Sequence, residues 1–329
     1  MLAVRVKWGI VSTANINRLF LAGACQSDSV EILAVASRDQ AKADEYAKSN
    51  DIERAYGSYD ALLNDPDVEA VYISLPNSLH VESTINALEA GKHVLCEKPL
   101  SRHPAEVERA FDIAEHNDRL LMEAFMWRHN PQTHRLTELI QQRAVGRIRI
   151  IRAAFGFVAP DPQDVRLDPK LDGGALMDVG CYCVSGARLI AGEPERVASE
   201  QALGGQGDGV DVAFAGVMRF KDDVTAHFDA GLALASQDLL EVVGDEGTLR
   251  LNDPWHCRQA GIDVIRFDDS IERIEVEPTN SYRLEAENMS AAIRGEAQLL
   301  LGREDAVGQA KAIEALYKAA DTGQTVSLF

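Results

Sequence analysis

The sequence predicts a doubly wound α/β domain followed by an α+β domain with a large, mainly antiparallel sheet. Up to about residue 125, short apolar segments alternate with longer amphipathic ones, which is typical of strand–helix crossovers in a parallel sheet. Beyond residue 146, strands follow one another on short polar links, which favours antiparallel pairing. A chain of 329 residues has room for two domains, which we place at 1–125 and 126–329.

Five strands and five helices are expected to alternate in the first part of the chain. Strands are expected in the short segments rich in Val, Ile, Leu and Ala, namely Val4–Val11, Val30–Ser37, Ala70–Leu75, His93–Cys96 and Leu120–Ala124. Helices are expected between them at Asn15–Gln26, Gln40–Asn50, Tyr59–Leu63, His80–Ala90 and Pro104–Asn117. Strand–helix alternation at this spacing predicts one parallel sheet with right-handed crossovers.

The pattern changes after a boundary near Glu123–Pro131. A helix at Pro131–Gln142 precedes a strand-rich region. Its expected strands are Arg147–Phe157, Arg196–Ala202, Asp211–Phe220, Val224–Ala233, Leu239–Gly244, Thr248–Asn252, Gly261–Phe267 and Ile271–Val276. Two helices, Tyr282–Arg294 and Glu304–Thr322, close the chain. Consecutive strands on short turns form an antiparallel sheet.

Acidic residues outnumber basic ones by 52 to 33, so the formal net charge is −19. A surface this acidic repels DNA and anionic lipid. Nucleic-acid and membrane-surface partners are therefore disfavoured. No apolar segment approaches the ~18 residues that a membrane span needs, and Met1–Ile10 lacks the basic and apolar regions of a signal peptide.

The five cysteines are odd in number and scattered, which favours reduced thiols in a cytoplasmic protein over a disulfide framework. Cys181 and Cys183 form a C-x-C. No second pair of Cys or His at metal-binding spacing accompanies it, so we expect a structural role for both residues and no metal site.

The segment after the first strand has the features of a phosphate-binding turn. It joins a buried strand to a helix N-terminus, where dinucleotide folds hold pyrophosphate with small residues. Ser12 and Ala14 take the places of two glycines of a G-x-G-x-x-G pattern. The residues expected to contact the pyrophosphate are Gly9, Ser12, Thr13, Ala14, Asn15 and Ile16.

The end of the second strand favours NADP over NAD, although NAD stays open. NAD sites usually offer an acid there to the ribose 2′-hydroxyl, whereas NADP sites offer Arg or Ser to the 2′-phosphate. Here Ser37 and Arg38 come first, with Lys42 one helical turn later. The alternative is that Arg38 pairs on the surface with Asp39 or Glu45.

Three further segments carry a resemblance to a known family. They are Leu75–His80 (LPNSLH), Glu97-Lys98-Pro99 and Gly173–Tyr182 (GGALMDVGCY). With the Gly9 turn, in this order and spacing, the chain resembles the glucose–fructose oxidoreductase / inositol dehydrogenase / rhizopine catabolism (Gfo/Idh/MocA) family. The resemblance implies a Rossmann domain, a C-terminal domain with a large open sheet that often forms a dimer interface, and hydride transfer between a nicotinamide cofactor and a carbohydrate-like compound.

The resemblance also assigns roles by position. It places Ser37 and Arg38 at the adenosine ribose, Tyr282 near the nicotinamide carboxamide, and Lys98 at both cofactor and substrate. It implies that the Lys98–Pro99 peptide is cis. The cofactor contacts that it implies are Gly9, Ser12, Thr13, Ala14, Asn15, Ile16, Ser37, Arg38, Leu75, Pro76, Asn77, His80, Glu97, Lys98, Trp127, Arg128 and Tyr282.

Many family members carry a histidine as acid/base where this chain has Tyr182. This resembles the tyrosine branch, which includes dimeric dihydrodiol dehydrogenase and NADP-dependent xylose dehydrogenase. A free tyrosine has a pKa of ~10, and a lysine ammonium within ~4–6 Å lowers it. We therefore predict Lys98, Tyr182 and Asp178 as catalytic residues. Lys98, Trp127, Asp178 and Tyr182 are the predicted substrate contacts.

Each of these residues also has a purely structural interpretation. Lys98 could lie on the surface and Tyr182 in the core. Asp178 could cap its helix, and His80 could pack on the sheet at a helix entry. Trp127 could be core at the domain junction.

The sequence thus predicts an NADP(H)-dependent oxidoreductase acting on an aldose such as D-xylose or glucose, in a cytoplasmic homo-oligomer. One alternative is a dicarbonyl-sugar reductase, or a dihydrodiol or cyclitol dehydrogenase, on the same scaffold. Another is a cofactor-binding sensor without turnover, since the family includes a fungal regulator of that kind.

Overall fold

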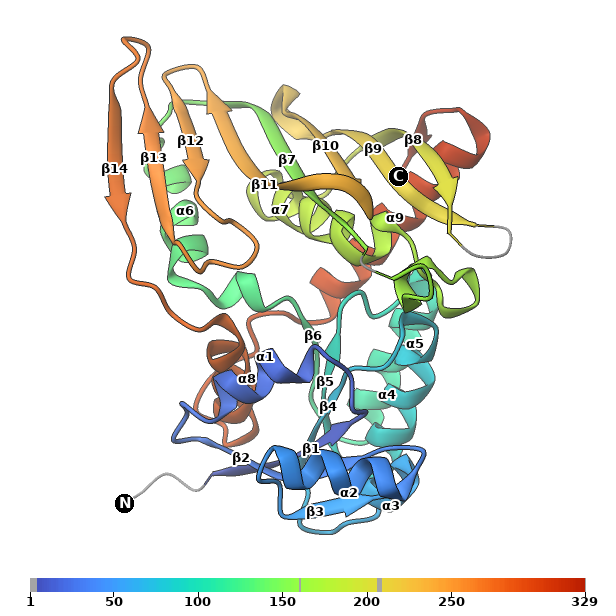
Figure 1. Cartoon of the computed structure of the whole chain (residues 1–329). Coiled ribbons are helices and arrows are strands. Elements are labelled where there is room, and N and C mark those ends of the chain that lie inside the picture. Colours follow the sequence, from blue (N-terminus) through green and yellow to red (C-terminus); the bar gives the residue numbers. More distant parts are fainter. Residues whose placement is uncertain (1–4, 160, 206–208, 329) are drawn as a thin grey trace. The chain divides into compact units, whose positions relative to one another are not determined.

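The computed structural model describes residues 5–159, 161–205 and 209–328, and the chain forms two compact units (Figure 1). The first comprises Met1–Met126 and Ser281–Val307, and the second comprises Trp127–Asn280 and Gly308–Phe329. The chain therefore returns to its first unit after leaving it. Our sequence-based boundary assigned Ser281–Val307 to the second domain, because periodicity does not reveal which core a helix joins.

The first unit contains a six-stranded parallel sheet of order β3-β2-β1-β4-β5-β6. Its strands are β1 (Val6–Val11), β2 (Val30–Ala36), β3 (Arg54–Tyr56), β4 (Ala70–Ile73), β5 (His93–Glu97) and β6 (Leu121–Ala124). This confirms the predicted parallel sheet and adds β3, which the sequence analysis did not identify. Val4, where the first strand was expected to begin, lies outside the described residues.

The helices of this unit begin and end close to the expected positions. They are α1 (Asn17–Ala24), α2 (Gln40–Ser49), α3 (Tyr59–Leu63), α4 (His80–Glu89), α5 (Pro104–His116) and α8 (Ser281–Ile293). Two of them are capped by a side chain at the N-terminus. Ser58 Oγ accepts a hydrogen bond from the Ala61 backbone N–H at 3.2 Å, and Asp39 Oδ1 accepts one from the Lys42 backbone N–H at 3.0 Å.

Helix α8 packs against α1. Gly23 on α1 permits this approach, because a Cβ there would lie 2.6 Å from the backbone nitrogen of Arg283. The fully buried Trp8 on β1 donates its indole N–H to Ser290 Oγ on α8 at 3.2 Å. These contacts hold Tyr282, near the start of α8, within the first unit.

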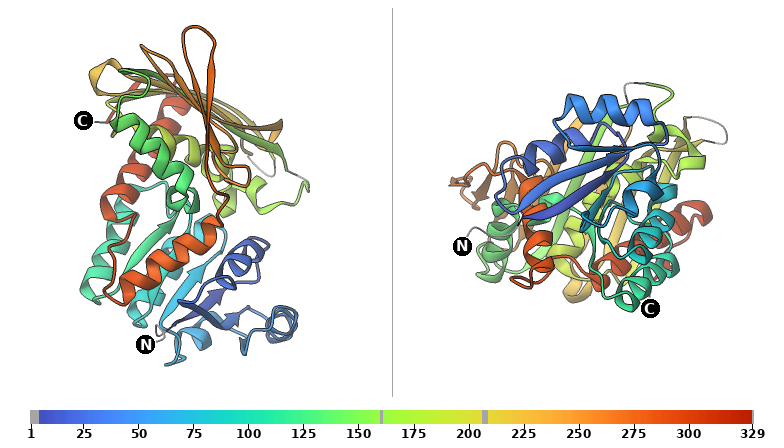
Figure 2. Two further views of the ribbon diagram at one scale, coloured as in Figure 1. Left: turned by 90° about the vertical axis from the view of Figure 1, so that its left-hand side faces the viewer. Right: turned by 90° about the horizontal axis from the view of Figure 1, so that it is seen from below.

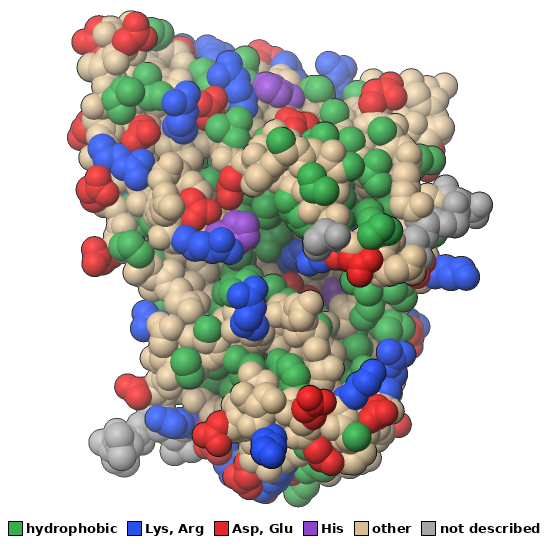
Figure 3. All heavy atoms as spheres, viewed as in Figure 1, with side chains coloured by type: hydrophobic (Ala, Val, Ile, Leu, Met, Phe, Trp, Pro, Cys, Tyr) green, Lys and Arg blue, Asp and Glu red, His purple; other side chains and the backbone are tan. Residues whose placement is uncertain are grey.

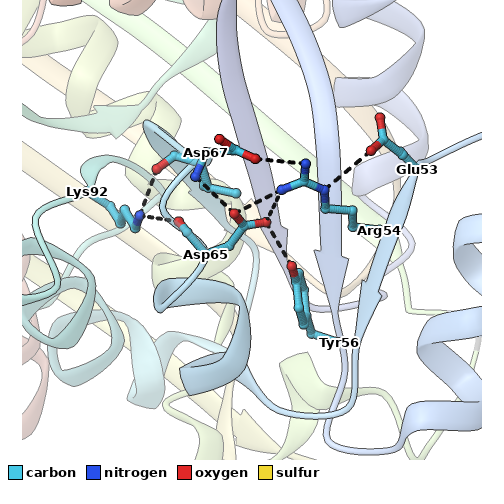
Figure 4. Close-up of polar contacts among 7 residues, drawn as sticks. Glu53, Arg54, Tyr56, Asp65, Asp67 and Lys92 are labelled. Atoms are coloured by element: carbon cyan, nitrogen blue, oxygen red, sulfur yellow. Dashed lines mark hydrogen bonds and ion pairs between the residues drawn. The ribbon is translucent and has the colours of Figure 1, made fainter.

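A hydrogen-bonded network lies at the edge of the sheet where β3, β4 and β5 begin (Figure 4). Arg54 Nη1 donates to both oxygens of Asp65 at 3.0 and 2.8 Å, and the Tyr56 hydroxyl donates to the same carboxylate at 2.8 Å. Lys92 Nζ donates to the carbonyls of Asp65 and Val68 at 2.6 and 2.7 Å. The Asp65 carboxylate thus ties β3 to the loop before β4, and the main-chain carbonyls of that loop tie it to Lys92, just before β5.

The second unit is built on a nine-stranded sheet of order β14-β13-β12-β11-β7-β10-β9-β8-β15. The strands are β7 (Ile148–Val158), β8 (Arg196–Gly204), β9 (Val210–Arg219), β10 (Thr225–Gly231), β11 (Ala233–Gly244), β12 (Thr248–Leu251), β13 (Gly261–Ile265), β14 (Ile271–Glu275) and β15 (Val326–Ser327). All neighbours pair antiparallel except β7 and β10, which are parallel. The mainly antiparallel sheet is confirmed.

Strand β11 begins at Ala233, although the sequence predicted Leu239. Its pairing with β7 shifts register between Ala233 and Gln237, so the alternation of buried and exposed side chains is interrupted there. That interruption conceals the first half of the strand in the sequence.

Helices cover one face of this sheet (Figure 2). They are α6 (Pro131–Gln141), α7 (Cys181–Ala191) and the part of α9 (Arg303–Thr322) that belongs to the second unit. Along β7, fully buried Ile151 alternates with exposed Ile150 and Arg152. Ile150 therefore points to the opposite face, which carries further exposed apolar residues such as Val217.

Acidic and basic side chains are intermixed on the face seen in Figure 3. Within the described part of the chain, no helix combines the length and apolar character needed to cross a membrane.

We predict that Asp65→Ala lowers the free energy of unfolding by about 3 kcal/mol, because Arg54, Tyr56 and the Asp67 backbone N–H lose a shared buried acceptor. Chemical denaturation measures the loss. Asp67→Ala is the matched control. Asp67 pairs with the same arginine at 2.8 Å but is half exposed, so its loss should stay within about 1 kcal/mol.

The Asp65 contribution should depend on pH. Burial alone would raise the pKa of Asp65, but hydrogen bonds from Arg54, the Asp67 backbone and Tyr56 outweigh it and hold this pKa below its ordinary value. The stabilisation is therefore present above the unfolded-state pKa of about 3.9 and is lost as the pH falls through the folded-state pKa. The difference in unfolding free energy between wild type and Asp65→Ala should shrink in acid. A difference that grew on acidification would contradict this assignment.

Candidate active site

The turn after β1 is held by a cluster of small polar side chains. Ser12 has a φ of 128°, a region that favours glycine. Its Oγ lies 2.8 Å from Ser74 Oγ and accepts from the Ala14 backbone at 3.1 Å. Asn17 donates to the Ser12 carbonyl at 3.0 Å and accepts from Ser74 at 2.5 Å. These bonds stabilise a serine where the glycine pattern has Gly. Ser74 and Asn17 were not singled out from the sequence.

The N-terminus of α1 fits a phosphate group. Its N-cap residue, Ile16, makes no side-chain cap hydrogen bond. Thr13, Ala14 and Ile16 are partly exposed and Asn15 is exposed. The first N–H groups of α1 donate to carbonyls of the turn, Asn17 to Ala14 at 3.1 Å and Arg18 to Asn15 at 3.2 Å. The positive end of the helix dipole and the small residues of the turn still favour an anion there, so the turn can hold a dinucleotide's pyrophosphate.

Ser37 and Arg38 follow β2 at the same edge of the sheet. Ser37 is buried, and its hydroxyl accepts from the Asp39 backbone at 3.4 Å. Arg38 is exposed, and within the described part of the chain it forms no ion pair with Asp39 or Glu45. Asp39 instead caps α2. The Arg38 guanidinium therefore remains available to an anion.

The segments after β4 and β5 are joined by His80. Its ring is buried, with Nε2 2.8 Å from the Leu75 carbonyl and Nδ1 2.8 Å from the Pro99 carbonyl. Burial, and secondarily the Lys98 charge, lowers the pKa of His80. The Lys98–Pro99 peptide is cis, as the resemblance implied. His80 is thus packed between the two loops and positions the one that carries Lys98. Asn77 lies in the 3₁₀ turn after Pro76.

Glu97, the last residue of β5, stabilises the loop that carries Lys98. Its carboxylate accepts from the Tyr72 hydroxyl and, at 3.3 Å, from the Lys98 backbone. Burial, followed by the charge of Glu97, raises the pKa of Tyr72 well above its usual value. The Leu100 backbone donates to Glu123 at 2.7 Å. Both carboxylates therefore hold the backbone beside Lys98 in place. Lys98 itself is partly exposed.

In the second unit, two close neighbours explain why residues 173 and 174 are both glycine. A Cβ on Gly173 would clash with the carbonyl of Arg166, and one on Gly174 with Asp211 Oδ1. Gly174 also has a φ of 123°. Asp211 accepts from the Leu176 backbone at 2.6 Å. The two glycines allow the chain to turn tightly around these groups before the next helix begins.

Asp178 is paired with an arginine that sequence reasoning missed. Arg166 Nε lies 2.9 Å from Asp178 Oδ2, and the Asp178 charge is the main reason that the pKa of Arg166 is raised. Asp178 belongs to a π-helical turn, Leu176–Gly180, which runs into α7. Asp178 and Tyr182, four residues apart, therefore lie on one continuous helical segment whose first turn is wider than a regular α turn.

Tyr182 lies near the start of α7 in an aromatic cluster. The centroid of its ring is 5.3 Å from that of Phe155 and 6.0 Å from that of Trp255. Trp255 in turn meets the edge of Trp127 at 5.2 Å. Tyr182 keeps 7% of its surface, whereas Trp127 and Trp255 are fully buried. Arg128 lies over the Trp127 ring at 5.8 Å and donates to Ser185 at 3.3 Å.

The predicted site residues thus form two groups. Those after β1, β2, β4 and β5 share the carboxyl edge of the first sheet, and Tyr282 lies in the same unit. Trp127, Arg128, Asp178 and Tyr182 belong to the second unit. Phe155 and Trp255 were missed because neither belongs to a motif. Arg166 had a weak signal, since it comes just before the glycine pair.

Both units match known protein families. Residues 6–125 match the oxidoreductase family with an NAD-binding Rossmann fold, and residues 133–250 match the GFO/IDH/MocA C-terminal domain. The chain is 37% identical to D-xylose 1-dehydrogenase (NADP(+)) 2 of Haloferax volcanii, over 98% of this chain and 99% of that protein. The chain belongs to the Gfo/Idh/MocA oxidoreductase family. It is an NAD(P)-binding oxidoreductase.

Two further similar proteins are informative. The chain is 32% identical to trans-1,2-dihydrobenzene-1,2-diol dehydrogenase of Xenopus tropicalis, over 76% of each protein. The crystal structure of aldose-aldose oxidoreductase from Caulobacter crescentus, complexed with glycerol, superimposes with a TM-score of 0.91 at 25% identity. It covers 98% of this chain and 99% of that one. The family membership confirms the resemblance on which the residue assignments were based.

We predict that Gly174→Ala destabilises the protein more than Gly192→Ala does. Both glycines have positive φ, at 123° and 80°, so alanine strains either backbone by about 1–3 kcal/mol. Only Gly174 faces a clash, with Asp211, whereas nothing lies within 4 Å of a Cβ on Gly192. We expect an additional loss of about 1–3 kcal/mol at Gly174 in urea unfolding. Equal losses would show that Asp211 moves aside.

Proposed function

We propose that the protein is an NADP(H)-dependent dehydrogenase that oxidises an aldose, such as D-xylose or glucose. The observation that carries the proposal is Tyr182 at the start of α7, buried within an aromatic cluster except for 7% of its surface. An apolar wall beside a phenol suits a sugar ring and its reacting hydroxyl. The similarity to a D-xylose dehydrogenase over nearly the whole chain supports this substrate class. When bound, the nicotinamide supplies hydride acceptor or donor chemistry.

In this proposal Tyr182 and Lys98 handle the proton of the reacting hydroxyl. A phenol with a pKa of about 10 is a poor base near neutrality, and a nearby ammonium favours the phenolate. The Lys98 ammonium provides that charge and hydrogen-bonds the substrate oxygen. The Tyr182 phenolate then takes the hydroxyl proton, and returns it when the reaction runs as a reduction.

Asp178 and Trp127 have supporting roles. We propose that Asp178 orients a substrate hydroxyl, since its ion pair with Arg166 fixes the position of the carboxylate. The Trp127 ring has no exposed face. We therefore propose for it the indirect role of holding Trp255, and through Trp255 the ring of Tyr182.

The preference for NADP rests on Arg38. Its exposed guanidinium follows β2, the position at which dinucleotide folds recognise the adenosine ribose, and Ser37 precedes it. A guanidinium recognises a phosphate through paired hydrogen bonds. The NADP(+) in the name of the Haloferax volcanii relative supports the same preference.

A dihydrodiol is the second candidate substrate, because the dihydrobenzenediol dehydrogenase is a relative at 32% identity. The aromatic surroundings of Tyr182 suit a cyclic diol as well as a sugar. A sensor without turnover is disfavoured by the presence of both Lys98 and Tyr182. A panel of pentoses, hexoses and dihydrodiols distinguishes these functions by the rate of NADP+ reduction.

We infer that the protein is a cytoplasmic homo-oligomer. The exposed apolar residues on the uncovered face of the second sheet, such as Ile150 and Val217, support a self-contact there. All five cysteines are free thiols, which supports a reducing compartment.

Lys98→Met and Tyr182→Phe should each lower kcat on the best sugar by about 10²–10⁴-fold, because each removes a group that handles the proton. Steady-state kinetics measures the loss, and NADP+ binding should persist in Tyr182→Phe. Lys311→Met, on the exposed side of α9, is the matched control and should leave kcat unchanged. Full activity in either site variant would refute the assigned roles.

Arg38→Ala should weaken NADP+ binding by about 10- to 100-fold, because a charge-assisted contact is worth about 1.5–3 kcal/mol. NAD+ binding should change little. Fluorescence titration of both cofactors provides the comparison. Equal losses for the two would remove the basis of the NADP preference.

A further inference from the structure

Three potential metal ligands converge beside the aromatic cluster of the second unit. Asp238 lies on β11, while Asp253 and His256 lie in the loop between β12 and β13. One ligand atom from each residue lies within 4.8 Å of the others. No motif spacing connects the three, so the sequence analysis expected no metal site.

The distances fit a coordination shell. His256 Nδ1 lies 3.5 Å from Asp238 Oδ2 and 3.7 Å from Asp253 Oδ1. Zinc bonds of about 2.0–2.2 Å in a tetrahedral site place neighbouring ligand atoms about 3.3–3.6 Å apart. Both distances from His256 are thus within about 0.4 Å of that spacing, and the two carboxylates lie within 4.8 Å of each other.

The ligands are held in place before any ion arrives. Asp253 Oδ2 accepts from the backbones of Arg258 and Gln259 at 2.6 and 3.1 Å, which leaves Oδ1 facing His256. The edge of the His256 ring contacts Phe155 with centroids 5.4 Å apart. Asp238 is paired with Phe155 across the β11–β7 ladder. Hydrogen bonds thus fix the Asp253 carboxylate, a ring contact restricts His256, and strand pairing places the backbone of Asp238.

An unpaired oxygen points to a missing partner. Asp238 Oδ1 is shielded from solvent and has no hydrogen-bond donor among the described residues. Within that same part of the chain, neither Asp238 nor Asp253 pairs with a lysine or arginine. Burial is the main cause of the raised pKa of Asp238, and the nearby Asp253 adds to it. Two carboxylates with no lysine or arginine partner in the described ranges offer oxygen ligands that a divalent cation would bind, with the imidazole as a third ligand.

We propose that Asp238, Asp253 and His256 bind a divalent transition-metal ion, with Zn²⁺ and Mn²⁺ as the best candidates. One imidazole with two carboxylates suits these ions better than Mg²⁺ or Ca²⁺, which prefer oxygen ligands alone. The proposal goes beyond the dehydrogenase function, because none of the three residues is assigned to the reaction.

The ion would have a defined structural effect. The loop that supplies Asp253 and His256 also carries Trp255, whose indole N–H donates to the Ala154 carbonyl at 2.9 Å and whose ring contacts Tyr182. A cation bound to Asp238 would tie this loop to β11. It would thereby fix the Trp255 ring beside the predicted catalytic tyrosine.

The test is calorimetric titration of the chelator-treated full-length protein with ZnCl₂ and MnCl₂, in excess Mg²⁺. We expect one strong site per chain and a rise in thermal unfolding temperature with the ion. Asp253→Asn and His256→Gln should each weaken binding at least about 10-fold. His134→Gln, which changes an exposed histidine on α6, is the matched control and should bind like the wild type.

Three results would overturn the proposal. They are the absence of stoichiometric binding, binding that survives both ligand variants, and equal weakening by His134→Gln. Thermal unfolding without metal shows whether the variants fold. If Asp253→Asn does not fold, Co²⁺ absorption spectra of wild type and His256→Gln decide, since a nitrogen ligand alters the visible bands. Because binding is measured without substrate, failure here leaves the dehydrogenase assignment untouched.

Discussion

Parallel pairing in the first sheet is the constraint on which the cofactor half of the candidate site depends. Because β1, β2, β4 and β5 run in one direction, the segments that follow them leave the sheet at one edge. The phosphate-binding turn, Arg38, His80 and Lys98 are neighbours for this reason alone, although they are far apart in the sequence. The Asp65 network works at the other edge, where strands begin, so the groups that hold the sheet together do not compete with ligand.

The sequence predicted the strand and helix pattern well wherever an element was long enough to show its periodicity. Strand β3 has three residues and β15 has two, too few for a pattern to be recognised. The start of β11 was missed because a register shift breaks its alternation. The return of Ser281–Val307 to the first unit was not predictable either, because it depends on the close approach of α8 at Gly23 and on the Trp8–Ser290 hydrogen bond.

The site residues could be named from the sequence, but their supports could not. Ser12 is held by Ser74, 62 positions away, and the Leu176 backbone by Asp211, 35 positions away. Such contacts arise from topology and leave no local signal. The same is true of Arg166 and Asp178, whose ion pair depends on the tight turn at the two glycines. Sequence motifs therefore indicated which side chains belong to the candidate site, while the fold determines the position and orientation of each one.

The serine at the phosphate-binding turn has a consequence for the thermodynamics of cofactor binding. A glycine in that position would leave the unliganded loop free to sample many backbone conformations, and binding would have to restrict them. Here Ser12, Ser74 and Asn17 already restrict the loop through mutual hydrogen bonds. Less conformational entropy remains to be lost when a dinucleotide arrives. A turn that departs from the glycine pattern is thus a preorganised one, which helps an acidic protein to retain an anionic ligand.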